Sequence, residues 1–305
     1  MAEVEVWRGS VAAWECDAMG HLNVGFYVAR SMEGLAGLAG ELGMASVFAP
    51  AAVTTLMVRE QHIRFLREAR VNAPLAMTGG VLSLDETEAR LLFVMRHASG
   101  ELAASFQTLV THATARDGRA FPWSDRLRAR AEALKTEIPD GAAPRSIGLE
   151  PIETQASLGR AEQLGLTRTG LGVVLADHCD AFGRMRVEGF MQRLSDAIPH
   201  LFAAHGRPGQ GGGRTNVGGA ALEYRLIHHA WPRAGDRVEL RSGVAGGDAR
   251  VQRLVHWMLD PVSGRPWGSA QAISVALDLE ARKIITLSDP ELAEIRKGWI
   301  EGLGL

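Results

Sequence analysis

Cysteine is scarce in this chain, in which Cys16 and Cys179 are the only two among 305 residues. Such a low content argues against a fold built on disulfides and predicts a cytoplasmic protein with reduced thiols. Long hydrophobic runs are missing as well, because no stretch of eighteen apolar residues occurs, so we expect no membrane span. The first seven residues contain neither a basic nor an apolar segment, so we expect no signal peptide.

The chain also lacks a large charge of either sign. Its 33 lysines and arginines nearly balance 35 acidic residues, which leaves a net charge of −2 and predicts neither nucleic acid nor an anionic membrane as partner. The histidines show no zinc-ligand spacing, so we predict no metal site. The glycine-rich stretch 206–219 lacks the ending of a phosphate loop, and we interpret it as either a mobile flap or a loop without function.

What the chain does contain is a motif that occurs twice. Cys16-Asp17-Ala18-Met19-Gly20 returns as Cys179-Asp180-Ala181-Phe182-Gly183, an interval of 163 residues (179 − 16), and further residues match at the same offset. A period held over about a hundred residues indicates a duplicated unit. We therefore predict two domains, residues 1–137 and 152–305, joined by a linker at 138–151, each able to bury a core because 46% of the residues are hydrophobic.

Each copy is predicted to contain one strand, a long buried helix and four further antiparallel strands. The long helices are expected at 23–42 and 186–204, because these segments are apolar on most faces. In the first copy the strands are expected at 4–14, 53–66, 75–84, 89–97 and 102–113, and in the second at 172–176, 222–228, 237–244, 250–259 and 269–277. With an amphipathic helix at 125–137, this pattern predicts an α+β fold.

Gly34, Gly37 and Gly40 recur at helical spacing in the first long helix. Each costs about 1 kcal/mol of helix propensity relative to alanine. Close contact with a surrounding sheet would offset this cost, so we expect a strand backbone to approach the helix backbone along these glycines.

Residues 16–27, Cys-Asp-Ala-Met-Gly-His-Leu-Asn-Val-Gly-Phe-Tyr, resemble the Asp-x-x-Gly-His-x-Asn-x-x-x-Tyr signature of hotdog-fold acyl-CoA thioesterases, in particular the 4-hydroxybenzoyl-CoA thioesterase-like branch. The signature lies between the first strand and the central helix, which is where this sequence places it. The resemblance implies a tandem double hotdog, in which two domains each wrap an antiparallel sheet around a long central helix. One chain would then imitate the dimer that this family usually forms.

This resemblance implies that the protein hydrolyses an acyl-CoA thioester to a free acid and coenzyme A. Asp17 would attack the thioester carbonyl or activate a water for that attack, and the sequence leaves both roles open. The backbone N–H of Val24, at the start of the long helix, would be the oxyanion donor. No cofactor is implied, since coenzyme A enters as part of the substrate.

His21 and Asn23 follow Asp17 closely, and each has two interpretations. Both are able to position Asp17 and the water through hydrogen bonds. Alternatively, Asn23 caps the helix and His21 is structural. Asp17 itself, taken alone, is equally compatible with an ordinary turn or capping aspartate.

The second copy keeps the carboxylate Asp180 and the helix-start residue Val187 but has Arg184 and Arg186 where the first has histidine and asparagine. Two arginines are expected to hold Asp180 in salt bridges, which is a poor state for a nucleophile. We therefore interpret the second site as degenerate or as converted to bind the phosphates of coenzyme A. Because hotdog sites lie between two units, the Asp17 site is expected to take its other wall from the second copy.

Two further pairs of matched residues are weaker candidates for a catalytic role. Glu60 and Glu223 occupy equivalent strand positions, and pairing with a neighbouring arginine is the favoured interpretation over an acid–base role. Cys16 and Cys179 have no clear activating partner, and Asp17 should disfavour the thiolate of Cys16.

Three alternatives to the acyl-CoA thioesterase stay open. The first is a hotdog hydratase or dehydratase. That chemistry resembles an Asp/His pair in an Asp-x-Asn-Pro-x-His pattern, which this sequence does not contain. A non-catalytic acyl-thioester-binding protein would explain the divergence of the second motif. An acyl carrier protein is a possible carrier in place of coenzyme A. We further expect the double unit to form a homo-oligomer.

Overall fold

A computed structural model describes residues 4–206, 208–209, 214, 216–281 and 283–305. Residues 207, 210–213 and 215 of the glycine-rich stretch lie outside the described residues, and so does the interpretation of that stretch as a flap. Contacts divide the chain into two compact units. The first comprises the chain up to Pro144 together with Asp177–Gln192, and the second comprises Arg145–Ala176 and Arg193–Leu305. The second motif thus belongs to the first unit, whereas the domain limits 137 and 152 stay a prediction.

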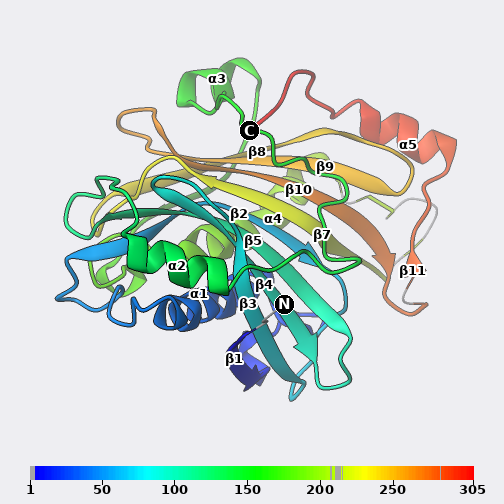
Figure 1. The fold of residues 1–305 in the computed structure, drawn as a ribbon. Coiled ribbons are helices and arrows are strands. Elements are labelled where there is room, and N and C mark those ends of the chain that lie inside the picture. The colour runs from blue at the N-terminus through cyan, green and yellow to red at the C-terminus, as the bar shows by residue number, and fades with distance from the viewer. Residues whose placement is uncertain (1–3, 207, 210–213, 215, 282) are drawn as a thin grey trace. The chain divides into compact units, whose positions relative to one another are not determined.

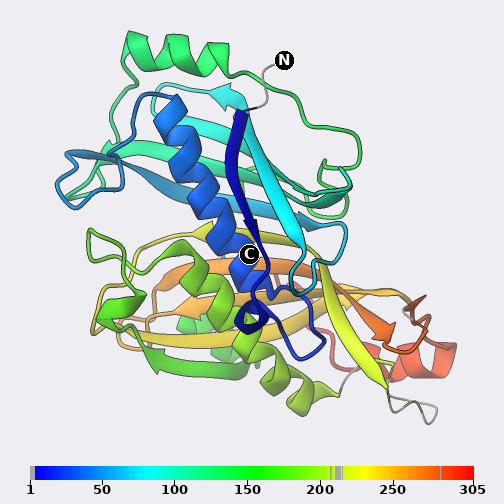
Figure 2. The ribbon, with the colours of Figure 1, turned by 90° about the horizontal axis from the view of Figure 1, so that it is seen from below.

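The first unit is an antiparallel sheet with a long helix on one face (Figure 1). Its strands are β1 (Val4–Ser10), β2 (Thr54–Phe65), β3 (Pro74–Leu84), β4 (Glu88–His97) and β5 (Leu102–Thr114), and its helices are the 3-10 turn η1 (Ala13–Glu15), α1 (Val24–Glu41) and α2 (Asp125–Ala133). The strands pair in the order β1-β3-β4-β5-β2. In Figure 2, α1 (blue) runs along the face of the blue and cyan strands, and it contacts β1 and β3.

Burial explains why α1 forms despite its three glycines. Asn23 caps its N-terminus, and Val28, Leu35 and Leu38 are almost completely buried against the sheet. The predicted close approach of backbones occurs at Gly37, where an added Cβ would lie 2.4 Å from the carbonyl oxygen of Val6.

The other two glycines of α1 behave differently. A Cβ at Gly34 would meet the Sδ atom of Met77 at 2.7 Å, which is the mobile end of a side chain, and a Cβ at Gly40 would meet nothing within 4 Å. The prediction that backbone approaches backbone along the whole glycine stripe is therefore wrong for Gly34 and Gly40. Of these three glycines, Gly37 is therefore the one whose nearest neighbours are strand backbone atoms.

The second unit repeats this architecture. Its strands are β6 (Thr167–Val173), β7 (Val217–His228), β8 (Arg237–Gly247), β9 (Val251–Leu259), β10 (Pro266–Asp278) and the short β11 (Lys283–Ile284), which pairs with β10. Its helices are α3 (Leu158–Gln163), the greater part of α4 (Val187–His205) and α5 (Asp289–Arg296). Most of the 3-10 turn η2 (Ala176–His178) and the start of α4, up to Gln192, belong to the first unit. The strands pair in the order β7-β10-β9-β8-β6, which is the repeat equivalent of the order in the first unit. This confirms the predicted α+β fold.

The duplication extends to irregularities of the backbone. The pairing of β2 with β5 shifts between Val58 and Glu60, which makes Arg59 the extra residue of a β-bulge. The pairing of β7 with β10 shifts at the equivalent place, next to Leu222. Both bulges turn the side chain of the extra residue out of the regular alternation of the strand.

A chain of polar side chains distinguishes the core of the second unit. The hydroxyl groups of Thr169 and Ser242 lie 2.8 Å apart, and Ser242 Oγ lies 2.8 Å from His256 Nδ1. All three residues are buried. Val6, Gly79 and Phe93 occupy the equivalent positions in the first unit, so its core is apolar where that of the second unit is hydrogen-bonded.

Most predicted elements agree with the structure to within about three residues, but the amphipathic helix predicted at 125–137 ends at Ala133. The other exceptions have physical causes. β1 ends at Ser10 rather than at Trp14, because the backbone enters η1, where the Glu15 carboxylate accepts a hydrogen bond from the N–H of Ala12 at 2.8 Å. β6 begins five residues before the predicted start at 172, and β7 begins at Val217, because glycines in both strands obscure their alternation. The short α3, β11 and α5 were not predicted.

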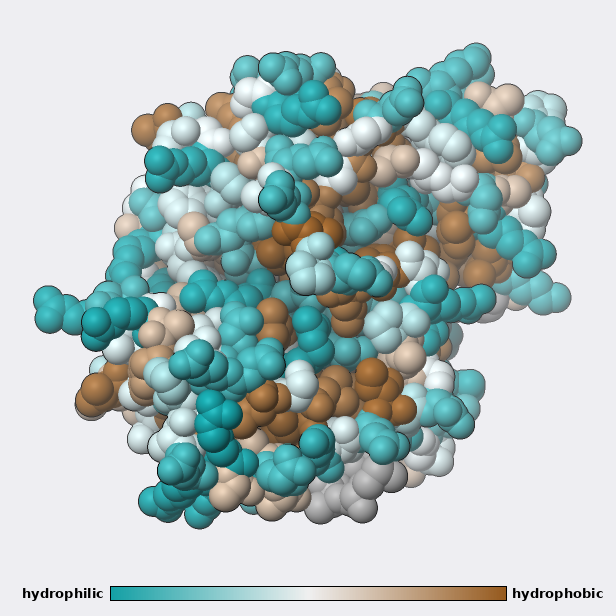
Figure 3. Space-filling view, turned by 45° about the horizontal axis from the view of Figure 1, so that its top comes forward, coloured by the Kyte–Doolittle hydropathy of each residue, from teal (hydrophilic) through white to brown (hydrophobic). Residues whose placement is uncertain are grey.

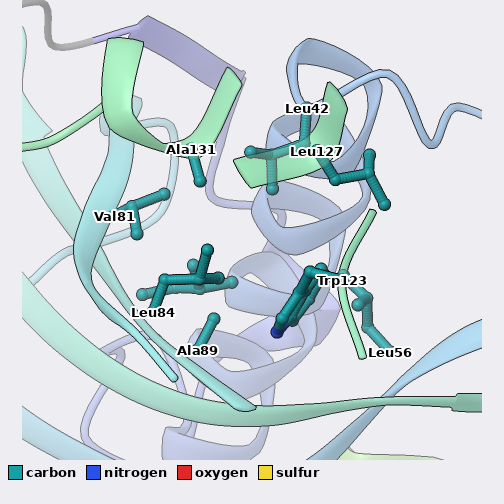
Figure 4. A pocket seen from close by; sticks show the side chains of 9 residues that line it. Leu42, Leu56, Val81, Leu84, Ala89, Trp123, Leu127 and Ala131 are labelled. Atoms are coloured by element: carbon teal, nitrogen blue, oxygen red, sulfur yellow. The ribbon is translucent and has the colours of Figure 1, made fainter. Parts of the chain in front are cut away.

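The helix α2 covers the same face of the sheet beyond the C-terminal end of α1. Apolar side chains from α2 and the segment just before it, from the end of α1 and from strands β2 to β4 enclose a cavity of about 10 Å³ (Figure 4). They are Leu42, Leu56, Val81, Leu84, Ala89, Leu91, Trp123, Leu127 and Ala131. A volume near that of a single water probe indicates a well-packed core rather than a ligand pocket.

Exposed apolar side chains are scattered over the surface, as is usual for a globular protein. On the face seen in Figure 3, the hydrophobic residues gather in several patches that hydrophilic residues border. Trp14 and Val53 are the most exposed large apolar residues. Among the described helices, none is long and apolar enough to cross a membrane.

Candidate active site

The first motif forms a tight turn around the carboxylate of Asp17. Its Oδ1 atom accepts hydrogen bonds from the backbone N–H groups of Met19 at 2.8 Å and His21 at 3.1 Å. Gly20 supplies the positive φ of 76° that closes the turn. Within the described residues, the Oδ2 atom of Asp17 accepts no hydrogen bond. One carboxylate oxygen is therefore fixed by the backbone and the other is uncommitted.

A buried ion pair holds this turn against the helix. Glu15 is only 3% exposed, and its carboxylate contacts the guanidinium group of Arg30 on α1. The carbonyl oxygen of Glu15 also accepts a hydrogen bond from the N–H of Asn23 at 2.9 Å. The turn is thus tied both to the start of α1 and to its second turn, which fixes Asp17 relative to the helix.

The N-terminus of α1 provides one uncommitted backbone donor. The side chain of Asn23 accepts the N–H of Gly25 at 2.9 Å, and the carbonyl of Asn23 accepts those of Phe26 at 2.9 Å and Tyr27 at 3.3 Å. The N–H of Val24 makes no hydrogen bond in the part of the chain that the structure describes. It is one of the N–H groups that a helix start leaves unpaired, and the helix dipole adds partial positive charge there.

The structure gives a different outcome for each of the two residues His21 and Asn23. Asn23 caps α1, as one interpretation predicts. The imidazole of His21 lies 3.0 Å from the carboxylate of Glu68, while only its backbone N–H contacts the carboxylate of Asp17. His21 thus positions Asp17 through its main chain, and its buried side chain links the turn to the segment after β2.

Tyr27 lies beneath the motif and was not predicted as a site residue. Burial is the main reason that its pKa rises to about 12, and the nearby carboxylates of Glu68 and Asp17 add to the shift. Its ring packs edge-on against Phe65 at 5.2 Å. Tyr27 therefore keeps its proton at ordinary pH and remains a neutral phenol.

The other candidate groups have structural partners. Glu60 pairs with Arg90 at 3.1 Å, as the favoured interpretation predicts, and Glu223 accepts backbone N–H groups at 145–147. Both cysteines are free thiols. Burial, followed by the charges of Asp17 and Glu15, raises the pKa of the Cys16 thiol. Cys16 is thus poorly suited as a nucleophile.

The second motif forms the same turn but leaves neither carboxylate oxygen of Asp180 uncommitted. Its Oδ1 atom accepts the backbone N–H groups of Phe182 at 2.8 Å and Arg184 at 2.9 Å. Its Oδ2 atom accepts the Nε–H of Arg184 at 3.1 Å. The guanidinium group of Arg184 also lies 4.8 Å above the ring of Phe182.

The prediction that both arginines pair with Asp180 is wrong for Arg186. Its guanidinium group lies 3.4 Å from the carboxylate of Glu188 in the first turn of α4. Arg186 stands where Asn23 caps α1 and has no short side-chain oxygen for capping, so it pairs with the nearest acid instead. Val187 begins α4 as Val24 begins α1.

Arg59 is a residue of the second motif's surroundings that the sequence did not reveal. It is the bulge residue of β2, and its charge interacts with that of Arg184. The only signal in the sequence is the contrast with Leu222 at the equivalent position. Among the described residues, no cluster of three or more histidine, cysteine or acidic side chains forms a metal site.

The motif turns occur in two regions that a single family profile matches separately. A family model described as "Thioesterase-like superfamily" matches residues 11–131 and, a second time, residues 173–295. The two matches confirm the internal repeat. No curated protein matches the sequence significantly.

Several solved structures share the fold over nearly the whole chain. A protein described as an oleoyl thioesterase from Lactobacillus plantarum has a TM-score of 0.66 and 14% identity, and the match covers 93% of this chain and 96% of that one. An acyl-ACP thioesterase from Bacteroides thetaiotaomicron has a TM-score of 0.65 and 9% identity, covering 88% and 96%. A 12:0-ACP thioesterase from Umbellularia californica has a TM-score of 0.63 and 11% identity, covering 88% and 92%. At such low identities the likeness shows a shared fold only.

Proposed function

Because the chain belongs to the thioesterase-like superfamily, we propose that it hydrolyses an acyl-CoA thioester to a free acid and coenzyme A, with Asp17 and the N–H of Val24 as its catalytic groups. Membership of the superfamily confirms the resemblance to tandem hotdog thioesterases and the predicted class of activity, thioester hydrolysis. The acyl-CoA substrate and the roles of individual residues are the content of the proposal.

The observation that carries the proposal is the pairing of one fixed and one uncommitted oxygen on Asp17. The bonds from Met19 and His21 fix Oδ1 in place, which orients the lone pairs of Oδ2. An oriented carboxylate loses little entropy when it attacks or when it accepts a proton. The uncommitted N–H of Val24, at the positive end of α1, is the matching electrophilic group.

Asp17 and the N–H of Val24 can hydrolyse the thioester by either of two routes, which give the same products. In the first, Oδ2 of Asp17 attacks the thioester carbon, the C–S bond breaks, and water then hydrolyses the resulting anhydride. In the second, Oδ2 takes a proton from a water that attacks the carbon, and the proton passes to the departing thiolate. In both routes negative charge develops on the thioester oxygen, where the N–H of Val24 stabilises it.

The proposal assigns hydrolysis to the first motif alone. Asp180 gives its second oxygen to Arg184, so it has no oriented lone pair for attack on a carbonyl. Breaking that contact costs the ion pair and leaves the buried guanidinium group of Arg184 without its carboxylate. One working carboxylate per chain therefore fits the local geometry better than two.

An acyl carrier protein is the second candidate for the carrier. Two of the structures that share the fold over most of this chain are described as acyl-ACP or 12:0-ACP thioesterases. The chemistry at Asp17 is the same for both carriers, because each presents its acyl group on a phosphopantetheine thiol. The two substrates differ in the protein surface that an acyl carrier protein would add.

The test measures thiol release from short, long and aromatic acyl-CoAs and from matching acyl carrier protein thioesters. The wild type is compared with Asp17→Asn, which keeps the shape of the turn but removes the charge. We expect hydrolysis of at least one acyl-CoA by the wild type and its loss in the variant. Turnover of the carrier-protein thioesters alone would move the proposal to that substrate. A folded wild type that hydrolyses neither, or a fully active variant, would contradict it.

A further inference from the structure

One edge of the second unit carries a row of exposed apolar side chains. Leu171, Val173 and Leu175 are 57%, 43% and 55% exposed, whereas the other exposed large apolar residues of the described chain are isolated in the sequence. The first two lie on β6, and Leu175 follows at the same spacing. The main chain of Val174 still pairs with the segment just before β8, so the chain stays extended up to Leu175. Alternate residues of an extended chain share one face, so the three side chains form one apolar row.

β6 is also the last strand of its sheet. It pairs with β8 on one side and with no described strand on the other. The carbonyl oxygen of Val173 accepts one hydrogen bond from Arg193 Nη2 at 3.1 Å, and a carbonyl oxygen has a second lone pair. An edge strand with an apolar face is a template for pairing with another chain unless charges or other segments protect it.

The first unit shows how the equivalent edge is protected. At the offset of 163 residues, β1 and the segment after it have a charged, a polar and a small side chain in place of the apolar row, namely Arg8, Ser10 and Ala12. Arg8 forms an ion pair with Glu5 on the same strand. Charged side chains are a common protection of edge strands. The second unit lacks this protection at the same place, which favours a partner strand there.

The apolar row is complementary to itself. When two copies of β6 lie antiparallel around a twofold axis at Val173, the two Val173 side chains face each other. In the same arrangement Leu171 of each copy lies opposite Leu175 of the other. Every exposed apolar side chain of the row then has an apolar partner across the strands, and such pairs stabilise a sheet.

Charges at the two ends of the row fit the same arrangement. Arg168 is exposed, lies opposite Arg241 in the pairing of β6 with β8, and has no acidic partner among the described residues. Asp177 follows two residues after Leu175, and its side chain is 79% exposed. Antiparallel pairing brings the start of one segment beside the end of the other, so Arg168 of each copy comes near Asp177 of the second copy. Opposite charges placed in this way favour one register over others.

We propose that β6 joins two copies of this chain into a twofold homodimer through Leu171, Val173 and Leu175. The contact uses the same surface on both copies, as a twofold interface requires. It does not depend on the proposed function, because β6 contains neither Asp17 nor Val24, so each proposal can fail without the other. An interface built on one strand edge is small, and the dimer is therefore in equilibrium with the monomer at about micromolar concentration.

Sedimentation equilibrium of the full chain, from about 1 to about 200 μM, measures this association, and we expect a Kd of roughly 1–100 μM for the wild type. The test variant combines Leu171→Arg, Val173→Ser and Leu175→Ala, each the residue at the equivalent position of the first unit. It should dimerise at least about 100-fold more weakly. Leu171→Arg alone should weaken the dimer at least about tenfold, and it keeps the test valid if the triple variant does not fold.

Val262→Arg is the matched control. Val262 is 77% exposed in the turn between β9 and β10, so the variant adds the same charge at an apolar surface residue away from β6. Its Kd should stay within about twofold of that of the wild type.

Cross-linking tests the twofold register. With the axis at Val173, Val173→Cys places two thiols face to face, and mild oxidation should join the two copies by a disulfide. Leu171→Cys places its two thiols about 13 Å apart along the strands, so it should cross-link no more than the wild type, which has only Cys16 and Cys179.

Three results would overturn the proposal. The first is a wild type that stays monomeric throughout this concentration range, including one that binds an acyl carrier protein through β6 instead. The second is a dimer that the triple variant leaves unchanged. The third is a disulfide that forms in Leu171→Cys and not in Val173→Cys.

Discussion

Arg184 donates its Nε–H to the Oδ2 atom of Asp180 at 3.1 Å, and this contact distinguishes the two copies of the motif. The same oxygen of Asp17 accepts no hydrogen bond within the described residues. The turns are otherwise alike, because Oδ1 accepts the backbone N–H groups two and four residues later in both. A single difference after the glycine, His21 against Arg184, thus leaves one carboxylate oxygen uncommitted in the first motif and pairs it with a guanidinium group in the second.

A double-mutant cycle on unfolding free energy measures this difference. The cycle of Asp180→Asn with Arg184→Leu should give a coupling energy of about 1 kcal/mol, since the pair is mostly buried. The matched cycle of Asp17→Asn with His21→Leu should give less than about 0.5 kcal/mol, because Asp17 bonds only to the backbone of His21. Equal couplings in the two cycles would argue against the asymmetry.

Asn23 links stability to the geometry of the oxyanion donor. Asn23→Ala removes the bond to the N–H of Gly25 and should lower the free energy of unfolding by about 1 kcal/mol. Asn23→Asp keeps the cap and should stay within about 0.5 kcal/mol of the wild type. Urea denaturation checks both values. A neutral Asn23→Ala would show that the cap contributes little to α1.

Gly37 and Gly40 form a matched pair on α1. Gly37→Ala should lower the free energy of unfolding by about 2 kcal/mol, because the new Cβ would lie 2.4 Å from the backbone oxygen of Val6. Gly40→Ala has open space and should raise it by up to about 1 kcal/mol through helix propensity. The same denaturation experiment compares them. Similar effects of the two substitutions would contradict the close approach at Gly37.

His256 should make stability depend on pH. Burial lowers the pKa of its imidazole from 6.5 to about 4, so between these values the unfolded chain binds a proton that the folded chain does not. The contribution of His256 is complete above pH 6.5 and falls by roughly 3 kcal/mol as the pH drops to 4.

The variant His256→Phe carries the residue that occupies this position in the first unit, Phe93. It should lose stability less steeply than the wild type over this pH range, whatever its stability at neutral pH. Denaturation followed through the adjacent buried Trp257 provides the measurement. Parallel curves for both proteins would mean that His256 titrates normally in the folded state.

The sequence predicts the repeat, the fold and the first motif well, because each is encoded locally. The segment Asp17–Asn23 forms its turn, and caps the following helix, through hydrogen bonds between residues close in sequence. The apolar faces of α1 explain its burial. The strands of the first copy alternate clearly, whereas glycines at 170, 172, 218 and 219 blur the starts of β6 and β7.

What the sequence could not predict depends on contacts between distant segments. Arg59 lies on β2, 125 residues (184 − 59) before Arg184, and no spacing rule connects a bulge to a turn. The partner of Arg186 depends on where the first turn of α4 places Glu188. Likewise, Gly37 differs from Gly40 only through the path of β1. These are properties of three-dimensional packing that a single sequence does not display.

The central claim is that Asp17 hydrolyses the thioester and Asp180 does not. The most direct test compares kcat/KM for the best acyl-CoA among the wild type, Asp17→Asn and Asp180→Asn, because the two variants make the same change in the same turn. We predict a loss of about 10²–10⁴-fold for Asp17→Asn and a change of less than about threefold for Asp180→Asn. Equal losses in both variants, or a larger loss in Asp180→Asn, would contradict the account.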